Sequence, residues 1–209
     1  MKRIIKDSEP EFWSDYKKRH PHDNYDALDN SDDGREIRYK LREHMLAYQK
    51  YICAYCSRQI TIDNSLNEHI KPKGVAEYAK YSMDYDNLVV SCVPEGTNRT
   101  CGAKKGNQYD ENLFVSPLQE DCETHFRYFP NGMIEGITEN GKYTVELLNL
   151  NSYVLKEARR SIYQECVSLH SKEFVKKYYI EPQDGKYRQF CDMVQYFYDN
   201  GMYDDKNTA

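Results

Sequence analysis

The sequence predicts a mixed α+β protein, mostly helical, that surrounds a small cysteine-held unit. Apolar residues recur at helical spacing over residues 35–51 and again from residue 151 onward, and only short extended segments lie between these regions. Four of the seven cysteines form two pairs that flank residues 57–91. We therefore expect the helices to support a unit that carries the chemistry of the chain.

The composition is that of a polar chain that still contains enough apolar residues for a core. Of 209 residues, 39% are hydrophobic, and the formal net charge is −5. No segment approaches the roughly 20 apolar residues of a membrane span, and residues 1–13 lack the apolar region of a secretion signal. We expect a cytoplasmic protein. Its negative charge excludes a general basic coat, so any contact with nucleic acid needs a local patch, a partner or a metal ion.

The first predicted helix covers residues 8–19. Ser8 is a suitable N-cap, and acidic residues and a proline follow in the first turn. Phe12, Trp13 and Tyr16 fall on one side at helical spacing. Because a helix of this length is marginal alone, its aromatic side is expected to pack either on the chain's own core or on a partner.

The segments that follow alternate between loop and helix. Residues 20–34 are acidic and rich in turn residues, which predicts a solvated loop ending in the N-cap of a helix over residues 35–51. Residues 112–150 are mixed, with extended pieces in "HFRYF" and "TVELL". Two further helices are expected in "SYVLKEARRSIYQECVSL", after an Asn151–Ser152 start, and in "KYRQFCDMVQYFYDNG".

The paired cysteines are the sharpest signal in the chain. Cys53 and Cys56 form a C-x2-C pair, and Cys92 and Cys101 form a wider second pair. Four thiolates suit a closed tetrahedral zinc site. The alternatives are a redox motif in the first pair or four unrelated buried thiols. The three remaining cysteines show no pairing pattern and are expected in the core: Cys122, Cys166 and Cys191.

Between and after these pairs the order of residues resembles the HNH nuclease family. C-x2-C is followed by an acid–histidine pair at Glu68 and His69, then by Asn87–Leu88, and finally by the second cysteine pair and a basic helix start. The resemblance covers about residues 50–108. It implies a ββα-metal core on a treble-clef zinc scaffold.

The resemblance also implies roles for individual residues. Phosphodiester hydrolysis needs an activated water and stabilisation of the developing negative charge. His69 is expected to be the general base, Glu68 a ligand of a catalytic Mg²⁺ or Mn²⁺, and Asn87 the residue that orients the histidine. Four lysines are expected to contact the phosphate backbone: Lys71, Lys73, Lys104 and Lys105.

One position departs from the family pattern. Many HNH enzymes carry Asn or His directly after the last zinc cysteine as a second ligand of the catalytic ion, and Gly102 stands there in this chain. Glycine has no side chain to offer. Asn107, Asn98 or a water molecule are the candidates to replace it.

Further segments resemble one subfamily, the PtuB nuclease subunits of Septu anti-phage systems and their retron-associated relatives. The resemblance rests on five stretches of the chain: "MKRIIKDSEPEFWSDYKK", "EHIKPKG", "CGAKKGN", "LFVSPLQEDCETHFRY" and "TVELLNLNSYVLKEARRSI". It implies an ABC/SMC-like ATPase partner of the PtuA type and a role in phage defence. The implied substrate is DNA, with RNA or tRNA as the alternative.

These observations predict three regions. Residues 1–34 hold the first helix and the acidic loop and are a candidate for partner docking, residues 35–120 form the zinc-bound nuclease core, and residues 121–209 form a mixed and then helical extension. Two other functions stay open. One is a zinc-stabilised interaction subunit with a weakened or inactive site, which Gly102 favours. The other is a stand-alone HNH endonuclease, for which no target-recognition domain is visible.

Overall fold

The chain folds into helices and a few short strands, as the predicted α+β class requires. The structure, a computed structural model, describes residues 1–93, 96 and 99–203. The strands form two antiparallel pairs, β1 (Ser65–His69) with β2 (Leu88–Cys92) and β3 (Phe126–Tyr128) with β4 (Ile134–Gly136). The α-helices of the described residues are α1 (Glu11–Arg19), α2 (Asp32–Tyr48), α3 (Cys101–Lys105), α4 (Glu139–Leu147), α5 (Tyr153–Ser168), α6 (Lys172–Val175) and α7 (Cys191–Asp199).

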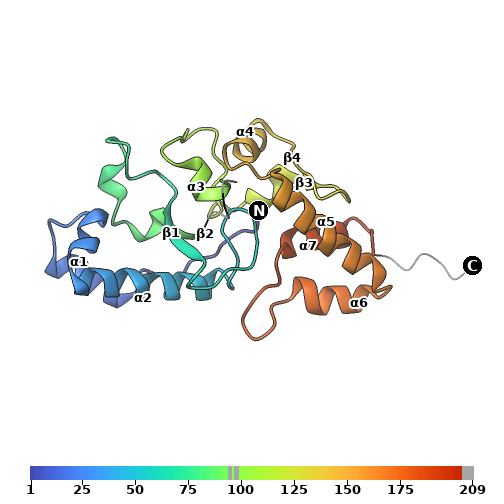
Figure 1. Cartoon of the computed structure of the whole chain (residues 1–209), viewed down its shortest axis with the longest axis horizontal. Helices are drawn as coiled ribbons and strands as arrows, with labels where there is room; N and C mark the ends of the chain where they lie inside the picture. The colour runs from blue at the N-terminus through green and yellow to red at the C-terminus, as the bar shows by residue number, and fades with distance from the viewer. Residues whose placement is uncertain (94–95, 97–98, 204–209) are drawn as a thin grey trace, which may run out of the picture.

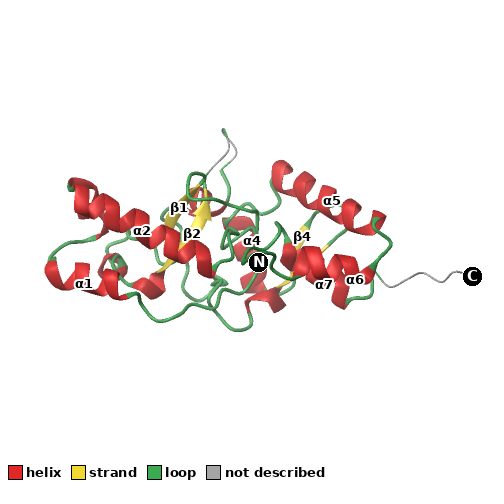
Figure 2. Cartoon of the chain, turned by 90° about the horizontal axis from the view of Figure 1, so that it is seen from below, coloured by secondary structure: helices red, strands yellow, loops and turns green. Residues whose placement is uncertain are grey.

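The elements follow one another along the long axis of the molecule. Helices α1 and α2 lie at one end, helices α5, α6 and α7 lie at the other, and β1 and β2 lie between them (Figure 1). Viewed from below, the strand pair β1–β2 lies beside α2, and β4 lies nearer the C-terminal helices (Figure 2). Buried apolar side chains from the α-helices and from β2, β3 and β4 form one core cluster. No helix in the described ranges is both long and apolar enough to cross a membrane.

The first residues of the chain join the two ends. The Met1 amino group forms a buried ion pair of 2.6 Å with Asp192 of α7. The backbone N–H of Ile4 donates to Pro117 O at 2.8 Å. Farther along, Lys6 Nζ donates to Leu88 O of β2 at 2.9 Å. This extended segment therefore fixes β2 relative to the C-terminal helices.

Helix α1 starts at a different residue than predicted, and its aromatic side is buried. It begins at Glu11 after Pro10, so Ser8 is not its N-cap. Pro10 has an extended backbone, which a proline adopts readily before a helix. Trp13 is fully buried, and its Nε1 donates to Met83 O at 3.1 Å. The aromatic side thus packs on the chain's own core. Of the two options that the sequence left open, this is the one without partner docking through Trp13.

The acidic segment before α2 is only partly solvated. It contains a 3₁₀ helix, η1 (Tyr25–Asn30), in which Tyr25 and Leu28 are buried. The expected N-cap at its end is confirmed, because Ser31 Oγ accepts from Gly34 N at 3.0 Å. Helix α2 therefore starts at Asp32, three residues before the predicted start at residue 35.

The C-terminal half confirms some elements and corrects others. "HFRYF" contains strand β3, and Ser152 caps α5 as predicted. The prediction of an extended "TVELL" is wrong, because these residues lie in or next to α4. Thr138 caps that helix, and the buried Thr144 Oγ1 accepts from Val115 N at 2.8 Å. Helix α7 begins only at Cys191, since Phe190 has a left-handed backbone (φ 59°).

Candidate functional site

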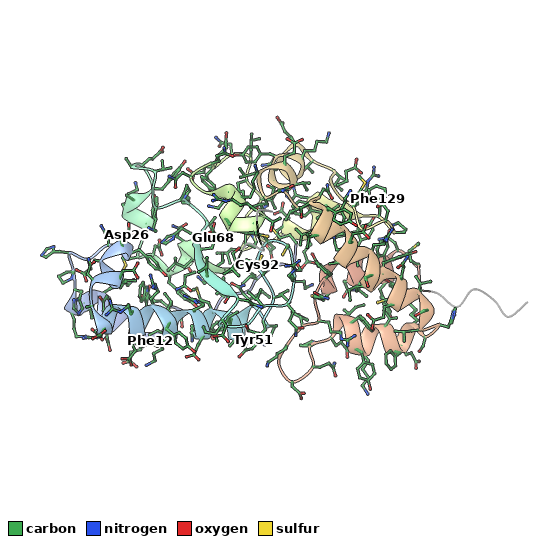
Figure 3. All side chains as sticks on the ribbon, in the orientation of Figure 1. Phe12, Asp26, Tyr51, Glu68, Cys92 and Phe129 are labelled. Carbon is green, nitrogen blue, oxygen red and sulfur yellow. The ribbon has the colours of Figure 1, made fainter. Side chains whose placement is uncertain are left out.

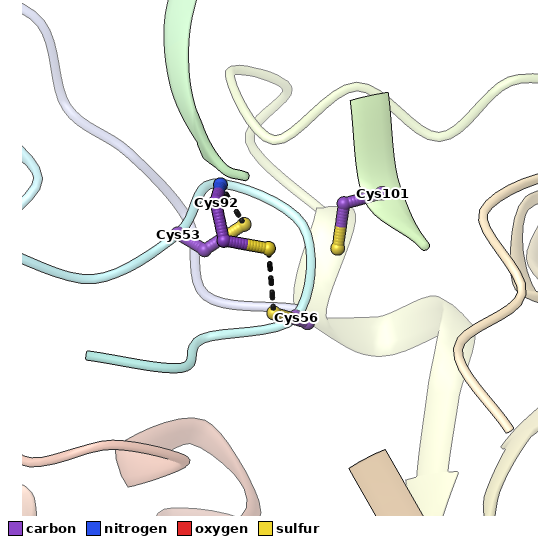
Figure 4. A group of neighbouring side chains, drawn as sticks. All are labelled: Cys53, Cys56, Cys92 and Cys101. Carbon is purple, nitrogen blue, oxygen red and sulfur yellow. Dashed lines mark hydrogen bonds between the residues drawn. The ribbon is translucent and has the colours of Figure 1, made fainter. Parts of the chain in front are cut away.

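The four paired cysteines come together in one buried cluster. Their sulfur atoms all lie within 4.8 Å of one another, and they come from three separate segments of the chain (Figure 4). A tetrahedral zinc site with bonds of about 2.3 Å places its sulfurs about 3.8 Å apart. Cys56 Sγ and Cys92 Sγ are 4.0 Å apart, close to that spacing. The predicted grouping is confirmed, and the donor set fits a metal ion such as zinc.

The first pair lies in a tight turn that resembles a zinc knuckle. An isolated bridge between Ile52 and Gln59 closes the turn. Inside it, Cys53 N donates to Arg58 O at 2.8 Å, and Ser57 N donates to Cys53 O at 3.0 Å. These bonds aim both sulfurs at the end of β2, where Cys92 lies.

The electrostatics of the cluster also favour a bound cation. Burial opposes thiolate formation, but hydrogen bonds from Cys101, Cys56 and Cys92 hold the pKa of Cys53 well below its usual range. The hydrogen bond that Cys101 gives to Cys53 raises the pKa of Cys101 well above its usual range. One thiolate is thus stabilised at the expense of the others. Only a cation would stabilise several together. The three unpaired cysteines, by contrast, are buried elsewhere as predicted: Cys122, Cys166 and Cys191.

Glu68 and His69 end strand β1 and have different surroundings. Successive side chains of a strand point to opposite faces. Glu68 contacts Tyr55 and Lys105, whereas the His69 ring contacts Tyr25 and Ser82. In the view of Figure 3, Glu68 lies between Asp26 and Cys92. The side chains of Glu68 and His69 share none of these contacts, although the sequence predicts both residues in one catalytic centre.

His69 is held as a neutral imidazole. Its Nε2 lies 2.9 Å from Ser82 O, and because a carbonyl only accepts, Nε2 carries the proton. Nδ1 therefore has the lone pair. The Tyr25 ring packs edge-on against the imidazole at 4.6 Å, and the residue is 6% exposed. Burial, with Lys73 and Lys105 nearby, lowers the pKa of His69 to about 4. At neutral pH the imidazole is therefore uncharged, and Nδ1 carries no proton.

Asn87 holds the loop that follows β1. Its Oδ1 accepts from Lys71 N at 2.7 Å, and its Nδ2 donates to Lys71 O at 3.0 Å and Tyr81 O at 3.1 Å. Tyr81 precedes Ser82, whose carbonyl binds His69. Asn87 therefore acts on the imidazole through the loop backbone and not by direct contact. The orienting role that the family resemblance implies for Asn87 stays a prediction.

The four predicted phosphate-contacting lysines are not equivalent. Lys104 is exposed on α3, and Lys71 and Lys73 are partly exposed on the loop after β1. Lys105 is 1% exposed and does not lie on the surface, where a phosphate contact was expected. Its Nζ donates to His69 O at 2.9 Å and Ile70 O at 3.3 Å and forms a 3.0 Å ion pair with Glu68. Lys105 is therefore a buried residue that holds the end of β1 in place through these contacts.

Glu68 is the side chain expected to hold a catalytic divalent ion, and its carboxylate already has a cationic partner. Mg²⁺ is usually bound by carboxylates and water, but the single charge of Glu68 is already balanced by Lys105. Burial nevertheless raises the pKa of Glu68. Within the described residues, the four cysteines are the one group of three or more His, Cys, Asp or Glu side chains close enough to share an ion.

The structure places one of the two asparagines proposed to replace a ligand at Gly102. The Asn107 amide lies against Gly74, in the loop after β1. Asn98 lies outside the described residues. A Cβ at position 102 would collide with Glu68 Oε2, so any larger residue would push the Glu68 carboxylate aside. The missing side chain at position 102 and the buried carboxylate thus belong to one packing arrangement.

Substitution of Gly102 by alanine is expected to destabilise this arrangement. The added methyl group must displace the Glu68 carboxylate from Lys105, at a cost of about 1–3 kcal/mol in the free energy of unfolding. Denaturant titration of Gly102→Ala, with the exposed Lys104→Ala as a neighbouring control, measures this cost. The double variant Gly102→Ala/Glu68→Ala should lose less free energy of unfolding than the sum of the losses in the two single variants. Strict additivity would contradict the predicted collision.

Several residues of the site were not foreseen from the sequence. Tyr25, which covers His69, belongs to a segment predicted as a solvated loop, although Tyr25 and Leu28 have the spacing of a helical turn. Tyr55 lies inside "CAYC", and its hydroxyl donates to Glu68 Oε1 at 3.3 Å. Ser82 contributes only a backbone carbonyl, which carries no signal in the sequence.

Comparison with known proteins identifies relatives of this chain. No family model matches it. It is 28% identical over 169 residues to "Retron Vc95 putative HNH endonuclease" of Vibrio cholerae serotype O1 biovar El Tor, a match that covers 74% of this chain and 81% of that protein. The resemblance to HNH endonucleases is confirmed. A second HNH relative, "Retron Ec83 putative HNH endonuclease" of Escherichia coli, is 28% identical over 206 residues, with 78% and 79% covered.

A third relative connects the HNH resemblance with Septu. The chain is 27% identical over 155 residues to "Septu protein PtuA" of Bacillus mycoides (strain KBAB4). The match covers 62% of this chain but only 21% of that protein. A segment related to this chain therefore occupies about a fifth of a much longer Septu protein.

Proposed function

We propose that this chain is an HNH nuclease that hydrolyses phosphodiester bonds of nucleic acid in an anti-phage defence system. The observation that carries the proposal is the position of His69. Its imidazole is neutral, its Nε2 is fixed by a carbonyl, and its Nδ1 forms no hydrogen bond with the described residues. This is the state that a general base needs before it accepts a proton. The retron HNH relatives support the same reaction class.

The proposed scaffold is the ββα unit of that family. It comprises β1, β2 and the short helix α3, which follow one another in the expected order. Zinc bound by the four cysteines would link the knuckle, the end of β2 and the start of α3. Its contribution is structural, because four thiolates leave no open position for substrate.

The proposed reaction needs only groups that the chain places near His69. Nδ1 accepts a proton from a water molecule while the water oxygen forms a bond to phosphorus, and the bond between phosphorus and the leaving oxygen breaks. The leaving oxygen then takes a proton from a solvent water molecule, and the His69 imidazolium returns its proton to the solvent. Ser82 O stabilises the imidazolium that forms, and Asn87 keeps the loop in place. Lys71 and Lys73 are close enough in sequence to contact the phosphate from the same loop.

The expected catalytic Mg²⁺ or Mn²⁺ would be held by Glu68, whose carboxylate would first have to leave Lys105. The same ion pair supports a second candidate function, a zinc-stabilised interaction subunit whose nuclease site is weakened. The two candidates differ in whether nucleic acid is cleaved at all.

The proposed partner is a PtuA-like ATPase. The support is the match to PtuA itself, in which a segment related to this chain is covalently attached to a larger protein. A separate chain would reach the same proximity by forming a complex. The net charge of −5 is consistent with a partner that supplies much of the contact with nucleic acid.

The experiment that tests the function is a cleavage assay with the zinc-loaded chain, alone and together with a PtuA-like ATPase. Plasmid DNA, single-stranded DNA and tRNA serve as substrates, each with Mg²⁺, with Mn²⁺ and with neither ion. Cleavage of any substrate supports the nuclease. A stable complex with the ATPase that cleaves none of them would favour the interaction subunit.

A further inference from the structure

Two lysines of the loop after His69 are already paired with acidic side chains. Lys71 Nζ lies 2.5 Å from Glu111 Oε1, and Lys73 Nζ forms an ion pair with Asp26. Both lysines belong to the group that the sequence predicts as phosphate contacts. Their ammonium groups therefore face carboxylates in the position where a phosphate would bind.

These acids come from distant parts of the chain and are held in place by folded structure. Asp26 is 47 residues from Lys73 and lies in η1, directly after Tyr25, whose ring covers His69. Glu111 is 40 residues from Lys71. Lys73 lowers the pKa of His69 and Asp26 raises it, so this pair lies near enough to act on the imidazole.

The pairs are accessible and exchangeable. The acid side chains are 72% exposed at Asp26 and 53% exposed at Glu111. Exposed ion pairs of this kind are weak and are screened by salt. A phosphate oxygen makes the same kind of charge-assisted hydrogen bond to an ammonium group as a carboxylate oxygen does. A nucleic-acid strand can therefore take over both lysines without unfolding of η1, although it must displace the two carboxylates.

We propose that Asp26 and Glu111 are specificity-determining residues that compete with the phosphate backbone for Lys73 and Lys71. This inference rests on the proposed nuclease function and concerns the same site. The two acids weaken binding of any strand that offers only a backbone contact. Strands delivered by a partner, or held by additional contacts, overcome this competition, and the isolated chain is kept from degrading nucleic acid at random.

The competition has a measurable consequence for salt dependence. When phosphate replaces Asp26 on Lys73, the freed carboxylate regains its own counterions, which offsets the counterions released from the nucleic acid. Replacement of the acid by a neutral residue removes this offset. The slope of log Kobs against log salt concentration should then become steeper for each acid that is replaced.

The test uses the full zinc-loaded chain in a His69→Gln background, so that binding is measured without cleavage. Fluorescence anisotropy with a labelled single strand and the matching duplex is recorded over a series of salt concentrations. Asp26→Asn and Glu111→Gln should each raise the affinity by about 2- to 5-fold, the factor of one exposed ion pair. The double variant should combine both increases and both changes of slope.

Glu135→Gln is the matched control. Glu135 is a partly exposed acid paired with Arg127 in the strand pair β3–β4, and its substitution changes the net charge by the same amount. It should leave affinity and slope unchanged. Lys71→Met and Lys73→Met should weaken binding.

The outcomes separate this inference from the proposed function. If Asp26→Asn and Glu111→Gln behave like Glu135→Gln, or if the lysine variants bind normally while cleavage still depends on His69, the competition is refuted and the nuclease stands. If neither binding nor cleavage is found for any form of the chain or its complex, both proposals fall.

Discussion

Replacement of Cys101 by serine is expected to release the bound metal and to disrupt cooperative folding around β2 and α3. Cys101 is fully buried at the first position of α3, and its sulfur completes a cluster contributed by three segments. Structural zinc in small domains contributes an apparent 10–16 kcal/mol at pH 7. Zinc content should fall from one ion per chain to near zero, and the melting temperature should fall sharply. Elemental analysis and thermal circular dichroism measure the two effects.

The matched control is Cys166→Ala, which removes a buried thiol from α5. This variant should lose some stability through a small cavity but keep its zinc. Freshly purified wild-type protein without zinc would contradict the prediction. So would a Cys101→Ser variant that keeps both its metal and its melting temperature.

Local signals were sufficient for the elements whose boundaries depend on neighbouring residues. Helix α5 and its Ser152 cap follow from spacing and capping alone, as does an N-cap before α2, although not its position at Ser31. The cysteine spacing predicted the cluster, because the ligands of a metal site must converge whatever the intervening fold. "TVELL" was misjudged because its β-branched residues favour a strand locally, whereas the Thr138 cap and the buried contact of Thr144 stabilise a helix.

The sequence alone does not predict which charged side chains pair with each other. Lys105 and Lys104 are adjacent and look alike in a basic run, yet one is buried against Glu68 and the other is exposed. Which of the two lysines is buried depends on which side of α3 faces the end of β1. In the same way, the proximity of Asp26 to Lys73 depends on the packing of η1 on α2. The sequence predicts which residues are reactive, but tertiary packing decides which of their charges remain unpaired.

The second large effect is expected for His69→Gln, which should lower the cleavage rate by about 10²- to 10⁴-fold, the usual contribution of a general base. Glutamine is chosen because its amide N–H is able to donate to Ser82 O as Nε2 of His69 does. It also fills most of the space against Tyr25, so the buried site is not left with a large cavity. What the variant lacks is a basic nitrogen at the Nδ1 position.

His44→Gln provides the matched control for this substitution. His44 is a second partly buried histidine with aromatic neighbours, Phe12 and Tyr48, and it lies on α2 away from the contacts of His69. Single-turnover cleavage should persist in His44→Gln and be nearly lost in His69→Gln, while both variants keep their zinc and their affinity for nucleic acid. Equal loss in the two variants would indicate a general effect on folding. Undiminished cleavage by His69→Gln would show that another group activates the water, because no amide accepts a proton near neutral pH.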